Sequence, residues 1–198
     1  ARYRVSRHPG PGSESRSKSG SQMDFSLIPP LLAGLLATVV MSLLMEALVF
    51  KGASSMPSMS LIIGSLFSED RDTAMTIGNG VHFLILGTML SGIGYAAALS
   101  VLEDPRWYAG VALGLIHGTA VGVGLGFRGV IQVKVRSVIE RRAPRRRRPL
   151  RDEKRVGSIR PGMFGVNWGD LTPLVLMSAH AANGYVFFLV YDLVTGGG

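Results

Sequence analysis

The 198-residue chain is rich in apolar residues and yet strongly basic: 47% of its residues are hydrophobic, the mean hydropathy is +0.31 and the formal net charge is +8. Apolar and basic residues must therefore lie in separate segments. Because the chain has no cysteine, the composition excludes disulfides, zinc–thiolate sites, iron–sulfur clusters and thiol catalysis.

Residues 1–26 form a polar, basic N-terminal tail of a composition that is disordered when alone. We expect no cleavable signal peptide, because the first apolar run is too long for a signal h-region. Met23 is a candidate for the biological start, in which case residues 1–22 would not belong to the native protein.

Four apolar stretches are long enough to cross a bilayer core of about 30 Å, which needs roughly 20 helical residues. They predict an all-α, polytopic membrane protein, with three spans within residues 27–127 and the last within residues 171–198. The predicted spans are Leu27–Phe50, Gly78–Leu102, Trp107–Phe127 and Leu171–Val194. Only four residues join the second and third spans, which predicts a tight helical hairpin.

Two loops have distinctive compositions. The segment Pro57–Phe67 is apolar but too short to span, and predicts a short interfacial or re-entrant helix. Residues 128–170 form an Arg-rich loop, with 13 Lys/Arg between Arg128 and Arg160 and four in a row at Arg145, Arg146, Arg147 and Arg148. We expect this run to bind anionic lipid headgroups or an acidic partner subunit rather than nucleic acid, since it lacks interleaved aromatic residues. A merely solvated loop is the alternative.

The third span carries glycine at every fourth position, which at 3.6 residues per turn gives one nearly straight stripe along a helix. The members are Gly110, Gly114, Gly118, Gly122 and Gly126. In lipid such a stripe allows a second backbone to approach closely. We expect it to pack on the second span, whose Gly87 and Gly94 would face it, or on a neighbouring subunit.

The two halves of the chain share weak similarities, such as Ala-Gly pairs early in spans one and three. They predict two repeated helical hairpins in parallel orientation. The positive-inside rule places the Arg-rich loop in the cytoplasm, and therefore both chain ends on the other side. The bacterial cytoplasmic membrane is the expected location.

Ionisable side chains inside a membrane cost roughly 2.5–3.5 kcal/mol on insertion scales and indicate function by default. The spans contain four: Glu46, His82, His117 and His180. Their depths along the spans suggest that Glu46, His82 and His180 meet in one leaflet, with His117 below them. Three interpretations stay open, namely interhelical hydrogen bonding, a haem or metal site, and a proton or ion relay.

Short motifs of this chain resemble a family of small, uncharacterised prokaryotic membrane proteins with four helices. The motifs are A-G-x-x-A-T-x-x-M at 33–41, V-H-F-L-I-x-G at 81–87, L-x-H-G at 115–118, P-G-x-F at 161–164 and H-x-x-x-G at 180–184. The resemblance covers about residues 31–191. It implies the four-helix fold, and no established activity comes with it.

No catalytic constellation or nucleotide-binding loop is apparent, so we expect no enzyme activity. The sequence favours a non-catalytic accessory subunit of a larger respiratory or photosynthetic membrane complex, with other membrane subunits and anionic lipids as its partners. The alternatives are a haem- or metal-binding membrane protein that uses the intramembrane histidines, and a small proton-coupled transporter centred on Glu46.

Overall fold

The computed structural model describes residues 26–102, 106–127 and 161–196. This part of the chain consists of helices and their connections, without a strand. The α-helices are α1 (Ile28–Phe50), α2 (Met59–Gly64), α3 (Arg71–Asn79), α4 (Gly92–Ser100), α5 (Trp107–Gly126) and α7 (Thr172–Thr195). A π-helix, η1 (Gly80–Ser91), joins α3 to α4, and a short 3₁₀ segment, η2 (Met163–Trp168), precedes α7.

In the described part of the chain, which is all helical, four helices are long and apolar enough to cross a membrane, as the predicted multi-pass architecture requires. They are Ile28–Phe50, Arg71–Ser100, Trp107–Gly126 and Thr172–Thr195. The second begins seven residues before the predicted Gly78, because α3, η1 and α4 form one continuous helix. The Asp70 side chain sets this start by accepting a hydrogen bond from the Thr73 amide at 2.9 Å.

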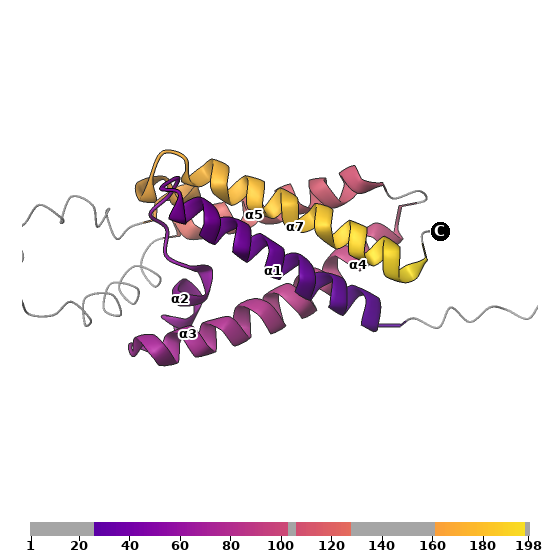
Figure 1. Cartoon of the computed structure of the whole chain (residues 1–198), viewed down its shortest axis with the longest axis horizontal. Helices are drawn as coiled ribbons and strands as arrows, with labels where there is room; N and C mark the ends of the chain where they lie inside the picture. Colours follow the sequence, from indigo (N-terminus) through magenta and orange to yellow (C-terminus); the bar gives the residue numbers. More distant parts are fainter. Residues whose placement is uncertain (1–25, 103–105, 128–160, 197–198) are drawn as a thin grey trace, which may run out of the picture.

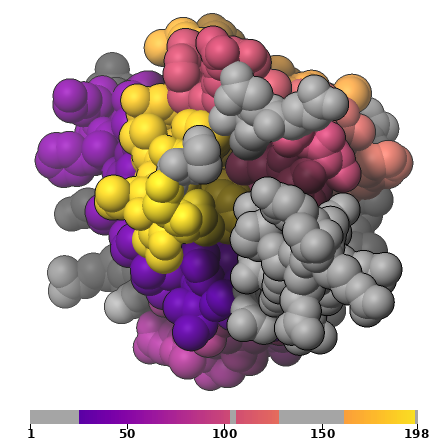
Figure 2. Space-filling model, turned by 90° about the vertical axis from the view of Figure 1, so that its right-hand side faces the viewer, coloured from indigo at the N-terminus to yellow at the C-terminus, as the bar shows by residue number. Residues whose placement is uncertain are grey.

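Helix α7 is the centre of the bundle. Its most extensive contacts are with α5 and then with α1, and Figure 2 shows α7 (yellow) lying between α1 (indigo) and α5 (pink). Leu176, Ala179 and Phe187 of α7 are fully buried. Figure 1 shows the start of α1 and the end of α7 at the same end of the bundle, as an even number of crossings requires.

The expectation that the glycine stripe of the third span packs on the second span is wrong. α4 and α5 make few contacts although they are neighbours in the sequence, and nothing lies within 4 Å of a Cβ built on Gly94. The glycine stripe of α5 faces α7 and η2 instead. The backbones of two helices approach most closely where both carry small residues at the crossing. On α7 this residue is Gly184, against which Gly110 and Gly114 lie.

The contacts along the stripe change from backbone to side chain. A Cβ on Gly114 would collide with the carbonyl group of His180, and one on Gly118 would lie 2.8 Å from the His180 Cβ. Farther along, Gly122 faces the Phe164 ring and Gly126 faces Met163. Phe164 adopts a positive φ of 55°, a conformation uncommon for a non-glycine residue. The stripe is therefore covered along its whole length by this chain itself.

A second close crossing joins α1 to the second span. A Cβ on Gly34 would lie 2.6 Å from the Gly87 carbonyl oxygen and 2.8 Å from the Gly92 Cα. Gly87 in turn faces the Thr38 side chain, which is 2% exposed. Glycine thus holds the second span against α1 and not against α5.

One end of the bundle is closed by connecting segments. The Trp168 carbonyl of η2 accepts hydrogen bonds from the amide and the hydroxyl of Ser55, at 2.8 and 2.7 Å, and Ser54 is hydrogen-bonded to Thr172 at 2.7 Å. A short helix, α2, does occur within the segment 57–67, where it packs mainly on α3. Its interfacial location and the repeated hairpins stay predictions. The N-terminal tail and Arg145–Arg148 lie outside the described residues.

The cap at Asp70 gives a first testable prediction. Its hydrogen bonds with Thr73 hold the pKa of the Asp70 carboxyl below its ordinary value of 3.8. The cap therefore contributes fully above that ordinary value, and its contribution is lost as the pH falls through the lower folded-state pKa. We expect Asp70→Ala to speed hydrogen exchange at the Thr73 amide, measured by NMR at neutral pH, and Asp70→Asn to leave it nearly unchanged. Equal exchange in the alanine variant and the parent would contradict this role.

Candidate functional site

Three histidines from three different helices line one internal cavity of about 50 Å³. They are His82 of η1, His117 of α5 and His180 of α7, and we call them the histidine centre. His82 and His180 are only 7% and 2% exposed. Helix α1 completes the wall with Thr38 and Met41, so all four spans meet here.

Hydrogen bonds hold each imidazole through one ring nitrogen. His82 Nε2 is hydrogen-bonded to Ser42 Oγ at 3.2 Å, and His117 Nδ1 to the Tyr95 hydroxyl at 3.0 Å. His180 Nδ1 lies 2.8 Å from the Leu176 carbonyl oxygen. Since a carbonyl only accepts, Nδ1 must carry the proton there, which leaves Nε2 of His180 to accept one.

The helix crossing of α5 and α7 brings two of the rings into contact. The ring centroids of His117 and His180 are 5.0 Å apart, with the planes at 78°. Gly118 follows His117 in the chain and lies against the His180 side chain. A larger residue at position 118 would separate the helices and with them the two imidazoles, so part of the glycine stripe shapes the centre.

The π-helix η1 determines which of its side chains face the cavity. Its buried residues are His82, Gly87 and Ser91, and all three line the cavity. In an α-helix of 3.6 residues per turn, residues five apart would point about 140° away from each other. The wider π turn brings them onto one face, and the hydroxyls of Thr88 and Ser91 donate to the carbonyls five residues earlier, at 2.7 and 2.8 Å. Such π segments occur frequently at functional sites.

Asn183 leaves a polar atom unpaired at this cavity. Its side chain lines the cavity and is 2% exposed. The amide nitrogen Nδ2 donates to the Tyr95 hydroxyl at 3.5 Å, whereas the oxygen Oδ1 has no hydrogen-bond partner. An unpaired buried oxygen costs about 1–3 kcal/mol. A cavity of this size holds roughly three waters, and water or another small polar molecule would satisfy Oδ1.

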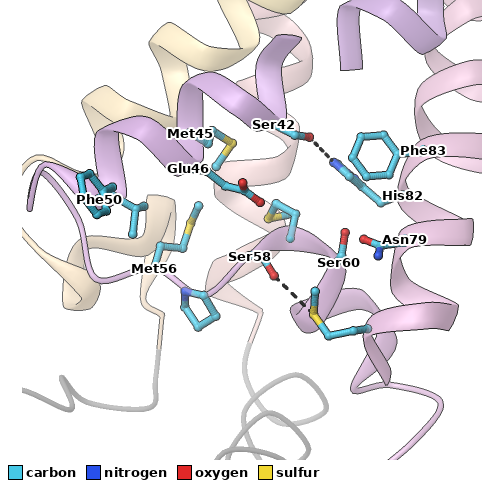
Figure 3. Close-up of a pocket in the computed structure, with 14 residues that line it drawn as sticks. Ser42, Met45, Glu46, Phe50, Met56, Ser58, Ser60, Asn79, His82 and Phe83 are labelled. Atoms are coloured by element: carbon cyan, nitrogen blue, oxygen red, sulfur yellow. Dashed lines mark hydrogen bonds between the residues drawn. The ribbon is translucent and has the colours of Figure 1, made fainter. Parts of the chain in front are cut away.

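Glu46 does not line this cavity, so the expectation that it meets His82 and His180 together, with His117 below, is wrong, although Glu46 shares a second pocket with His82. The exposed side chain of Glu46 lines this second, open pocket of about 300 Å³ between α1, α2, α3 and η1 (Figure 3). His82 lines both this pocket and the internal cavity. Ser42 joins Glu46 at the pocket wall and is hydrogen-bonded to His82.

Sequence reasoning missed Tyr95 and Asn183 as members of the site. The spacing of His180 and Asn183, three residues apart on one helix, places both on one face, and this was a usable signal. Among the described residues, no three histidine, aspartate or glutamate side chains group as they would around a metal ion.

No family model, no curated protein and no solved structure matches this chain. The resemblance to uncharacterised four-helix membrane proteins therefore stays a prediction.

Proposed function

We propose that the protein is a small proton-coupled membrane transporter whose proton site is the histidine centre. The observation that supports this proposal is a small cavity inside a bundle of apolar helices, where three imidazoles and an amide oxygen without a protein partner meet in an otherwise largely apolar wall. Histidine and glutamate chains within membranes are typical of proton relays.

The arrangement gives a proton a route from the open pocket to the bundle interior. His82 lines the pocket on one side and the cavity on the other. Waters in the cavity would link it to His117 and His180, whose rings touch. Imidazole suits each step, because one ring nitrogen can take a proton while the other gives one up.

Interhelical hydrogen bonding alone explains less of the site. It accounts for Ser42 with His82 and for Tyr95 with His117. It leaves Asn183 Oδ1 without a protein partner at the cavity, where a water would satisfy it. A site that exchanges water or protons needs a polar atom of this kind, which is available to accept a hydrogen bond from a water.

Proton flux into proteoliposomes tests this function. With a potassium diffusion potential as the driving force and a pH-sensitive dye inside, the parent chain should acidify the lumen. We expect His117→Phe to lower the rate at least about tenfold, because it removes the imidazole between His180 and Tyr95. The matched control is His8→Phe, which changes the one histidine outside the predicted spans and should leave the rate unchanged. Equal flux in both variants and the parent would overturn the proposal.

A second candidate is the accessory-subunit function in a membrane complex. It is supported by the charge of residues 128–160, which hold 13 Lys/Arg against three acidic residues, a surplus suited to an acidic partner subunit or anionic lipid. The glycine stripe gives this function little support, because α7 and η2 cover the stripe and leave it unavailable to a neighbouring subunit. Gentle purification should yield a defined larger complex that is lost when Arg145–Arg148 are replaced by glutamine. A monomer in both cases would contradict it.

A further inference from the structure

The pocket that contains Glu46 has the size and wall of a ligand site. Its volume of about 300 Å³ is at the lower end of the range for small-molecule pockets. The wall is largely apolar and includes the side chains of four methionines, Met45, Met56, Met59 and Met75, and of two phenylalanines, Phe50 and Phe83. Methionine is flexible and polarizable, and is common where a surface adapts to ligands of different shapes.

Among the described residues that line the pocket, Glu46 alone carries a formal charge at neutral pH. Figure 3 shows its carboxylate pointing into the space between α1 and η1. The nearest cation along the chain, Lys51, is exposed and does not line the pocket. A carboxylate within a membrane span costs roughly 2.5–3.5 kcal/mol on insertion scales, and a bound cation would offset that cost.

The chemistry of the wall selects among cations. A small inorganic ion is held by several oxygen ligands that replace its water, and a mostly apolar wall lacks them. An organic ammonium is weakly hydrated by comparison, and its alkyl or aromatic groups gain by contact with thioethers and rings. Phe50 and Phe83 also line the pocket, and aromatic rings attract a cation in addition to the charge of Glu46.

We propose that this pocket binds lipophilic organic monocations, with Glu46 as the counter-ion. The inference deepens the proposed function and rests on it for its physiological use, since it names the substrate class of the transporter. His82 lines both the pocket and the histidine centre, so the same wall would sense the bound cation and the proton.

The binding test uses the full chain in lipid nanodiscs and two probes that differ only in charge. Benzyltrimethylammonium is the cation, and neopentylbenzene, in which carbon replaces nitrogen, is its neutral counterpart. Calorimetry should show saturable binding of the cation at one site and at least about tenfold weaker binding of the neutral probe. Equal affinity for the two probes would overturn the inference.

Four variants locate the site. Glu46→Gln should weaken cation binding at least about tenfold, and Glu46→Asp should restore most of it because the charge is kept. Asn79→Lys places a competing ammonium at the pocket wall from an exposed position and should abolish binding even if Glu46→Gln does not fold. Asp192→Asn, an exposed acidic residue at the far end of α7, is the control and should bind as the parent does. Unchanged binding in both Glu46→Gln and Asn79→Lys would contradict the assignment.

The two proposals fail separately. If His117→Phe and the parent show the same proton flux while the cation binds through Glu46, the transport function is wrong and the binding site stands. If flux depends on His117 but the cation binds no better than its neutral counterpart, the substrate class is wrong and the proton function stands.

Discussion

Gly114→Ala is expected to destabilise the folded protein strongly, whereas Gly124→Ala on the same helix is expected to leave it unchanged or more stable. A Cβ at position 114 collides with the backbone carbonyl of His180, and the backbone cannot rotate away as a side chain does. We expect a loss of at least about 1–3 kcal/mol in the free energy of unfolding. At position 124 nothing lies within 4 Å of the new methyl group, so alanine should gain up to about 1 kcal/mol from helix propensity.

Unfolding of both variants in one detergent, followed by circular dichroism, measures the difference. A bulkier substitution, Gly118→Leu, should prevent folding altogether because the leucine side chain would overlap with the side chain of His180. If Gly114→Ala and Gly124→Ala unfolded alike, the close contact of α5 with α7 would be wrong. The histidine centre would lose its geometric basis at the same time.

Asn183→Leu is expected to separate stability from function. Leucine has the same branched skeleton as asparagine, with larger methyl ends for which the adjoining cavity has room, and it removes the unpaired Oδ1 at the loss of one long hydrogen bond to Tyr95. The free energy of unfolding should therefore stay the same or rise by about 1 kcal/mol. Proton flux in proteoliposomes should fall at least about tenfold, because the cavity loses a polar group that holds water.

The opposite result for Asn183→Leu identifies a structural role. If asparagine serves only to hold helices together, leucine should lower stability and leave the flux per folded molecule unchanged. Asn183→Asp is a useful companion variant, since it keeps the size and the polar oxygen at this position. Stabilising changes that cost activity are common at functional sites.

The sequence was sufficient for the four spans because each is a long apolar run with few charges. It was also sufficient to predict a close packing surface on the third span, because a stripe of glycines in a membrane helix allows another backbone to approach closely. It could not identify the partner of that surface. The sequence does not distinguish Gly184 on α7 from Gly87 on η1 as a packing partner. Only the crossing geometry shows that Gly184 faces the stripe.

The histidine centre was predictable in its members and not in its arrangement. His82, His117 and His180 were evident as polar groups in apolar helices. Their common cavity depends on η1, because the π turn places His82, Gly87 and Ser91 on one face, and sequence periodicity at 3.6 residues does not reveal a wider turn. Glu46 was misplaced for the related reason that depth along a span does not fix the direction around it.

Several motifs behind the family resemblance converge on the site. Thr38, His82, Gly87, His117 and His180 all belong to them, and all five line the internal cavity. The short motifs are scattered between residues 33 and 184, yet the fold brings these members of four motifs to one place.

The most direct measurement on the centre is ¹⁵N NMR of the histidine-labelled protein in bilayers, recorded across the pH range in which it stays folded. We predict that His82, His117 and His180 change protonation as a coupled group, so that His117→Phe shifts the titration midpoints of the other two. Titration of each histidine independent of its neighbours, or no protonation of the three at any pH, would contradict a shared proton site.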